Sequence, residues 1–190
     1  LFSKEVVELV CEEVKDEHRF AITRLVADSA IEALLRMLAT YRTSAKTLLE
    51  ITCGVINQRL VRRLCVDCRQ PFQPSPQLLQ KLGIPAGRIQ QLYQPYIPPP
   101  PEQRVDANGK PIEIPICKKC GGRGYFGRAA IYELLVLDGE LRKAIVKNPA
   151  PDAVLAVARS RGFLAIQDEG ILAVLTGMTS LQELQRGLSK

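Results

Sequence analysis

The sequence predicts an α+β protein in three parts, because its 190 residues fall into three stretches of different character. Residues 1–60 combine helical apolar spacing with one short β-like run, which favours a partial α/β core element. Residues 61–135 are rich in proline and glycine and hold two pairs of cysteines, which favours a tetracysteine domain. Residues 136–190 return to helical spacing and predict a helical C-terminal subdomain.

Four elements are expected in the first part. Apolar spacing predicts a helix over residues 3–17, and the apolar run 20–26 predicts a buried strand. Ser29 and Glu32 fit a capping box at the start of a second helix, and a third helix is expected over 43–60. Because the strand has no partner strand in this chain, we expect this part to be the end of a truncated core.

The middle part loses its helical periodicity. The four prolines 98–101 predict an extended surface segment. The pair Asn108-Gly109 predicts a hairpin turn. A strand is expected over 129–137, where the chain becomes apolar again.

The tail is expected to be helical. Ser180 and Glu183 fit a second capping box, which predicts that a last helix begins there. Three helices are expected before it, over residues 139–147, 151–160 and 166–176.

Basic charge is concentrated in the middle of the chain. The net charge is +6, but residues 61–130 carry 11 Lys and Arg against 4 Asp and Glu, which gives +7. Such a segment is compatible with nucleic acid, phosphate, anionic lipid or an acidic protein surface. There is no run of eighteen apolar residues and no secretory signal pattern, so no membrane span is expected. The chain begins at Leu1 rather than Met, and we expect it to be a piece of a longer protein.

Four of the six cysteines form two C-x-x-C pairs that predict a metal site. Cys65 and Cys68 are separated from Cys117 and Cys120 by forty-eight residues. A tight turn directs both sulfurs of a pair at one ion, and two such turns supply the four thiolates that zinc prefers. The glycines after the second pair allow positive φ, which lets backbone N–H groups face the sulfurs. We therefore expect one structural zinc ion.

Other interpretations of these cysteines stay open, namely reduced core thiols or a redox-active pair. Neither pair opens a helix after a strand, as thioredoxin-like pairs do. A catalytic zinc is not favoured, because the only histidine, His18, lies far away in sequence and is expected at the surface of a helix end. Cys11 and Cys53 stand alone in apolar patterns and are expected in the core.

No catalytic or nucleotide-binding residue is predicted in this chain. The P-loop pattern G-x-x-x-x-G-K-[ST] is absent, and Gly109-Lys110 lacks the upstream glycine. The patterns G-x-S-x-G and H-E-x-x-H are absent too, and a single histidine excludes reaction schemes that use two.

Two stretches around the cysteines resemble a known family. Residues 58–68 read QRLVRRLCVDC, and residues 117–135 read CKKCGGRGYFGRAAIYELL. They resemble the C-terminal region of the hexameric motor ATPases of type II secretion and type IV pilus assembly, the GspE/PilB type. In that family a similar segment leads into a tetracysteine zinc domain, a strand ending Y-E-L, and a tail similar to Gly177, Thr179, Ser180 and Glu183 here. Motif order and spacing agree over about residues 50–190.

Residues 4–49 resemble the family more faintly, as the part of its RecA-like core after the Walker B strand. The family's histidine box Leu-His-Thr-Asn-Asp reads Leu-Val-Ala-Asp-Ser over residues 25–29. Its Thr-Gly-His reads Glu-His-Arg over residues 17–19. Val26 cannot sense a γ-phosphate, so either nucleotide chemistry has been lost in this homologue or these segments do not correspond.

The resemblance implies a C-terminal portion of an assembly ATPase, with structural Zn²⁺ here and ATP with Mg²⁺ only in the parent protein. It implies a homo-hexamer that docks on inner-membrane platform proteins at the cytoplasmic face, and no activity of this chain alone. Two alternatives stay open: a zinc-ribbon module that binds nucleic acid, and an inactive pseudo-ATPase scaffold. Nucleic acid is not the favoured partner, because few aromatic residues lie among the basic ones.

Three arginines before the first cysteine pair have more than one interpretation. Arg59, Arg62 and Arg63 would share one face of a helix. That face is either a solvated basic surface, a subunit contact or an edge that faces phosphate.

Overall fold

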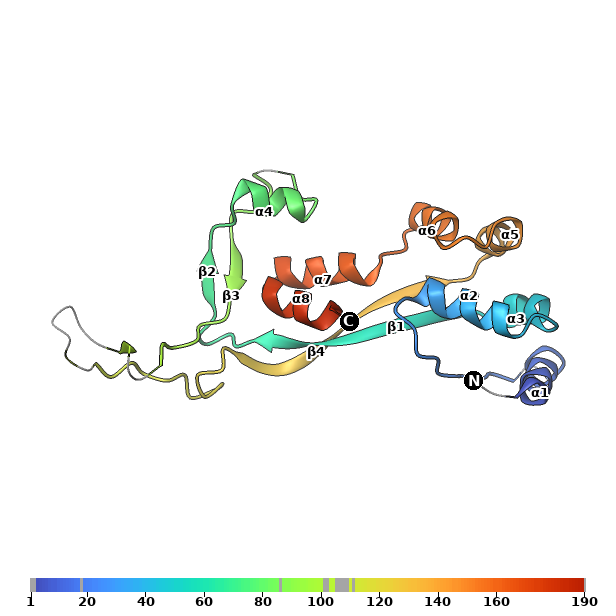
Figure 1. The fold of residues 1–190 in the computed structure, drawn as a ribbon, viewed down its shortest axis with the longest axis horizontal. Helices are drawn as coiled ribbons and strands as arrows, with labels where there is room; N and C mark the ends of the chain where they lie inside the picture. Colours follow the sequence, from blue (N-terminus) through green and yellow to red (C-terminus); the bar gives the residue numbers. More distant parts are fainter. Residues whose placement is uncertain are drawn as a thin grey trace. The chain divides into compact units, whose positions relative to one another are not determined.

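The computed structural model describes residues 3–17, 19–85, 87–100, 103–104, 110 and 112–189. In these residues the chain is a mixed α/β protein with eight helices and two small sheets (Figure 1). The helices are α1 (Lys4–Lys15), α2 (Ala30–Thr40), α3 (Ala45–Ile51), α4 (Pro76–Lys81), α5 (Gly139–Lys147), α6 (Pro151–Ser160), α7 (Ile166–Leu175) and α8 (Leu181–Leu188). The strands are β1 (Gly54–Leu64), β2 (Gln70–Phe72), β3 (Leu92–Gln94) and β4 (Tyr125–Val136).

The chain folds into two compact units, each made of two separate stretches. Unit 1 comprises Leu1–Gln58 and Tyr132–Ile166, and unit 2 comprises Arg59–Ile131 and Gln167–Lys190. The division at residues 60 and 135 that the sequence suggested stays a prediction, because these units group residues by proximity alone.

The two long strands, β1 and β4, pair with each other and run antiparallel. The Leu137 N–H donates to the Cys53 carbonyl at 3.0 Å, beside the start of β1. The Cys65 N–H donates to the Gly124 carbonyl, also at 3.0 Å, beside the end of β1. The end of β1 therefore meets the start of β4, so the residues that follow β1 lie next to those that precede β4.

A hydrophobic core holds unit 1 together. Its buried side chains come mainly from α2, α5, α6 and the end of β4: Ala30, Ile31, Leu34, Leu49, Leu135, Leu137, Leu141, Ile145, Val154, Ala158 and Phe163. A second cluster packs α1 against α3 and the end of α2: Val7, Cys11, Tyr41 and Leu48. Full burial of one large aliphatic side chain contributes about 1.5–3 kcal/mol, so apolar packing is the main stabilising term in this unit.

One buried carboxylate accepts hydrogen bonds from two backbone N–H groups within unit 1. Glu133, on β4, is 2% exposed and accepts hydrogen bonds from the backbone N–H groups of Ala30 and Ile166, the latter at 2.9 Å. The Asn57 side-chain amide donates to it at 3.3 Å. Because the first N–H groups of a helix have no partner within the helix, Glu133 satisfies donors at the starts of both α2 and α7.

The expected helices of the tail and the N-terminus are confirmed. The three helices over 139–147, 151–160 and 166–176 correspond to α5, α6 and α7 within a residue. Ser3, Ser29 and Ser180 cap α1, α2 and α8, as each side chain accepts a hydrogen bond from the backbone N–H three residues later.

Two expected elements are wrong. Residues 20–26 form no strand, and Phe20, Ile22 and Val26 are 80%, 87% and 78% exposed. A strand needs a neighbour for its backbone hydrogen bonds, and none of the described strands pairs with this segment. The helix expected over 43–60 ends at Ile51, and β1 begins at Gly54. The hydrogen bonds that extend β1 come from β4, which is distant in sequence, so local apolar spacing did not reveal them.

This correction changes the interpretation of nearby residues. Arg59, Arg62 and Arg63 lie on a strand and share no helix face. Cys11 is buried as expected, whereas Cys53 is exposed at the start of β1 and its expected place in the core is wrong. The strand expected over 129–137 is confirmed as part of the longer β4. His18, the turn at Asn108-Gly109 and Pro101 lie outside the described residues.

The close approach of α7 and α8 predicts a position that tolerates only glycine. A methyl group added at Gly170 would lie 2.3 Å from Cδ1 of Leu184, which is 5% exposed. We expect Gly170→Ala to lower the free energy of unfolding by about 1–3 kcal/mol, because overpacking forces the buried neighbour to move. Gly139→Ala is the control, since no atom lies within 4 Å of its added methyl group. Thermal unfolding by circular dichroism measures both, and equal melting temperatures would contradict the prediction.

Candidate metal centre

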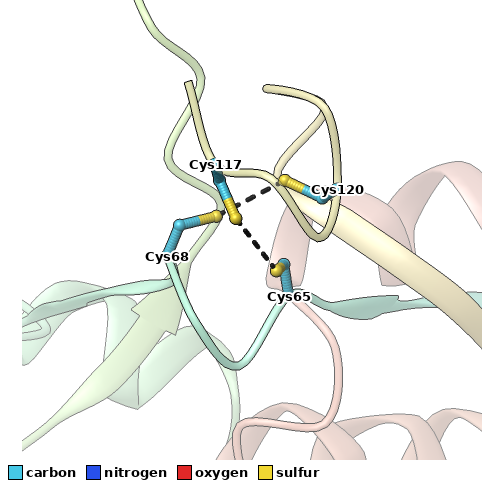
Figure 2. A group of neighbouring side chains, drawn as sticks. All are labelled: Cys65, Cys68, Cys117 and Cys120. Atoms are coloured by element: carbon cyan, nitrogen blue, oxygen red, sulfur yellow. Dashed lines mark hydrogen bonds between the residues drawn. The ribbon is translucent and has the colours of Figure 1, made fainter. Parts of the chain in front are cut away.

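The four cysteines predicted as ligands come together in unit 2, with their side chains pointing toward one another (Figure 2). All four sulfurs lie within 4.8 Å of each other. The Sγ atoms of Cys65 and Cys117 are 3.7 Å apart, and those of Cys68 and Cys120 are 3.6 Å apart. Cys65 and Cys120 are buried, and the other two are partly buried. Each of these two contacts thus joins a sulfur of the first pair to a sulfur of the second.

These distances match the edges of a coordination tetrahedron. With metal–sulfur bonds of about 2.3 Å, a regular tetrahedron has edges of about 3.8 Å. A disulfide would bring two sulfurs to about 2.05 Å, and all four thiols are free. The donor set is therefore able to surround one metal ion and leaves no ligand position open.

Each pair sits on a tight backbone turn. In the first turn the N–H groups of Cys68 and Arg69 donate to the Cys65 carbonyl, at 3.3 and 2.9 Å. In the second turn the Gly121 N–H donates to the Cys117 carbonyl at 2.8 Å. Such a turn places both sulfurs of a pair on the same side of the chain. The antiparallel end of β1 and β4 then brings the two turns face to face.

Backbone N–H groups after the second pair favour a thiolate at Cys120. Burial raises the pKa of this thiol, but hydrogen bonds from the Gly124 N–H, from neighbouring thiols and from the Gly122 N–H lower it to about 7. Gly122 and Gly124 have φ of 77° and 72°, as the sequence predicted for glycines in this position. Burial raises the pKa of Cys65 and Cys68. Because a metal binds thiolates, binding releases the protons that these thiols hold.

Glycine is also required at position 124 because a side chain there would clash with neighbouring atoms. A methyl group there would lie 2.5 Å from Cβ of Pro95 and 3.1 Å from the Tyr96 carbonyl oxygen. The segment that follows β3 therefore packs directly against the backbone of the second turn. An ion pair between Lys119 and Asp67, 3.0 Å long, joins the two turns at the surface. Both side chains are well exposed, so this pair contributes less than about 1 kcal/mol.

The C-terminal tail is fastened to β1 just before the first cysteine turn. The Leu64 N–H donates to the Met178 carbonyl at 2.9 Å, and the Thr179 hydroxyl donates to the Arg62 carbonyl at 2.8 Å. The Tyr125 hydroxyl, at the start of β4, lies 2.7 Å from the Ser180 hydroxyl. These bonds hold α8 against the strands that carry the cysteine turns.

Glu183 is the central residue of this attachment, although the sequence suggested only a capping role for it. Its side chain is fully buried, and its two oxygens accept five hydrogen bonds. The donors are the Arg62 backbone N–H and the guanidinium groups of Arg62 and Arg186, at 2.6–3.0 Å. Bonds from Arg186, opposed by burial and reinforced by Arg62, lower the pKa of Glu183 to about 2. The capping-box spacing located this residue, but no local pattern revealed its partner on β1.

The family of this chain follows from comparison with known proteins. The family described as Type II/IV secretion system protein matches residues 3–186, which is nearly the whole chain. The chain belongs to this family. The resemblance stated from the sequence is thereby confirmed.

Relatives of this secretion-family chain include proteins named for both systems. It is 37% identical over 133 residues to a Type IV pilus assembly ATPase PilB of Thermus thermophilus, which covers 69% of this chain and 13% of that protein. It is 36% identical over 135 residues to a Type II secretion system protein E of Dickeya dadantii, covering 70% and 22%. It is 34% identical over 167 residues to a Type II secretion system protein E of Pseudomonas aeruginosa, covering 87% and 26%. The chain thus spans 13% to 26% of the length of these relatives.

No helix in the described part of this secretion-family chain combines the length and the apolar character needed to cross a lipid bilayer.

The sulfur geometry predicts one metal ion per chain. We expect Cys65→Ser to lose the ion, since three thiolates cannot close the tetrahedron. Cys53→Ser is the control, because Cys53 is exposed and lies outside the cluster. Native mass spectrometry of chain purified under reducing conditions measures the metal content. A chelator should lower the melting temperature of the wild type by about 10 °C or more. A metal content unchanged in Cys65→Ser would refute the site.

Glu183 predicts an acid-sensitive attachment of the tail. A carboxylate whose pKa is lower in the folded than in the unfolded chain stabilises the fold above the unfolded value. This contribution is complete above about pH 4.5 and is lost as the pH falls toward 2. We expect Glu183→Gln to cost about 1–3 kcal/mol at pH 7, with the difference from wild type closing between pH 4.5 and 2. Urea unfolding at several pH values measures it, with the exposed Glu113→Gln as control. A difference that is independent of pH would contradict the role.

Proposed function

We propose that this chain is the C-terminal portion of a type II secretion or type IV pilus assembly ATPase, in which it supplies a structural zinc domain and assembly contacts. The observation that carries the proposal is the closed four-thiolate cluster in a member of the Type II/IV secretion system family.

Zinc is the metal that the donor set favours. Four cysteine thiolates in a tetrahedron suit zinc or an iron–sulfur site, and two C-x-x-C turns that close around one ion are typical of structural zinc. All four positions are filled by protein, so no place remains for a substrate or a reactive water. The segment between the two turns contains little regular structure. Its described residues form one short helix, α4, and two three-residue strands, β2 and β3. A segment with so small a core of its own gains its stability from the ion.

The remaining parts are proposed to follow the parent protein. Residues 1–60 would be the end of its RecA-like core, residues 61–135 its zinc domain and residues 136–190 its helical C-terminal subdomain. ATP with Mg²⁺ would bind to the parent rather than to this chain, which carries no P-loop sequence. No catalytic residue is assigned here.

The parent is proposed to act as a homo-hexamer on inner-membrane platform proteins, at the cytoplasmic face of the membrane. Its relatives are named as a pilus assembly ATPase and as secretion system proteins, which supports ATP-driven export or pilus assembly as the process. Family membership favours this role over the nucleic-acid-binding alternative.

The full-length gene that contains this segment provides the test. We expect Cys65→Ser to abolish protein export or pilus assembly in a strain that depends on the gene, because an unfolded zinc domain cannot hold its contacts. Cys53→Ser should keep at least about half of the wild-type output, since the exposed thiol lies outside the cluster. Secreted protein or surface pilin is quantified by immunoblot at equal amounts of ATPase. Wild-type output from Cys65→Ser would show that the proposed function is wrong.

A further inference from the structure

A small basic pocket in unit 2 is not explained by the metal centre. It has a volume of about 390 Å³ and is lined by Leu60 and Val61 together with Arg62, Arg128 and Arg186. The charged residues of its lining are therefore arginines alone, and they come from β1, β4 and α8. Guanidinium groups donate hydrogen bonds and accept none, so the pocket is built for an acceptor that carries negative charge.

Two of the three arginines are held in place by Glu183. Arg62 and Arg186 each use Nε and Nη2 to reach this carboxylate, which leaves Nη1 of both without a partner among the described residues. Arg62 also lies over the ring of Tyr125, 4.3 Å from its centre. Fixed side chains lose little entropy when they bind a ligand, so these two donors are preorganised.

The third arginine, Arg128, is not held by Glu183. Arg128 is exposed, and no hydrogen bond or ion pair joins its side chain to another described residue. Glu183 cannot turn toward it, because both carboxylate oxygens are already occupied by five donors. One buried negative charge against three positive charges leaves the pocket with a charge of +2.

We propose that this pocket binds the phosphate group of a ligand, with Arg128 as its principal free donor. A phosphate monoester carries about −1.5 to −2 charges at neutral pH, which matches the charge of the pocket. Its three terminal oxygens can each face one guanidinium, whereas a carboxylate has only two oxygens for three donors. The phosphate belongs to a soluble ligand or to a lipid headgroup, since the recognition chemistry is the same.

Titration of the whole 190-residue chain with inorganic phosphate tests the pocket. Isothermal calorimetry at fixed ionic strength should give saturable binding, and amide NMR shifts should be concentrated at the end of β1, the start of β4 and α8.

We expect Arg128→Gln to weaken phosphate binding about tenfold or more, because it removes charge-assisted hydrogen bonds. Arg88→Gln removes the same charge at an exposed residue outside the pocket and should change the affinity less than about twofold. Arg128→Lys, which keeps the charge but not the fork of donors, should fall between them.

Two further titrations of the same chain identify the source of the phosphate. Adenosine monophosphate represents a soluble ligand, and vesicles of phosphatidic acid in phosphatidylcholine represent a lipid headgroup, with pure phosphatidylcholine vesicles as control. Binding that depends on Arg128 in either arm supports the proposal. Equal losses in Arg128→Gln and Arg88→Gln would overturn it, because they indicate unspecific attraction. A hexaglutamate peptide that binds through Arg128 while phosphate does not would also overturn it, and would assign the pocket to an acidic protein.

Experiments can refute phosphate binding in the pocket without refuting the proposed function. Arg128 contacts neither the cysteines nor the tail in any described interaction, so its variants should keep the metal content and melting temperature of the wild type. A chain that binds metal but not phosphate refutes the pocket alone. The wild-type NMR mapping needs no variant and decides the location independently.

Discussion

The meeting of the end of β1 with the start of β4 is the constraint on which unit 2 depends. A backbone hydrogen bond from Cys65 to Gly124 fixes this end of the strand pair. It places two cysteine turns that are separated by forty-eight residues close enough for four sulfurs to share one ion. The long segment between the turns then becomes a closed loop anchored at its base, and closing such a loop costs entropy that a metal ion can offset.

The same end of the sheet receives the C-terminal tail through polar rather than apolar contacts. Glu183 is buried in a charged state, which is costly unless every lone pair is satisfied. The two guanidinium groups and the backbone N–H that surround it meet this condition. A buried ion network of this kind needs defined hydrogen-bond geometry, and here it joins α8 to β1. The arginines that it fixes are also those that line the basic pocket.

Different kinds of interaction therefore stabilise the two units. Unit 1 is a core of aliphatic side chains with one internal carboxylate, Glu133, that serves helix starts. Unit 2 combines a cluster of four cysteines able to hold a metal ion, a charged attachment of the tail, and glycines that allow close backbone approach, as at Gly124. We expect such a unit to respond to metal and acid, whereas unit 1 should respond mainly to changes in packing.

The sequence alone determined the features that depend on neighbours along the chain. The cysteine spacing predicted that four cysteines come together, and serine three residues before an acidic residue located the start of two helices, since turns and caps are local. The family also followed from the motifs around the cysteines. The tertiary structure alone decided that residues 54–64 form a strand rather than a helix, because the hydrogen bonds that select the strand come from β4. It also decided that Glu183 meets Arg62 and that three arginines share a pocket, because these contacts join residues far apart in the chain and leave no periodic pattern in the sequence.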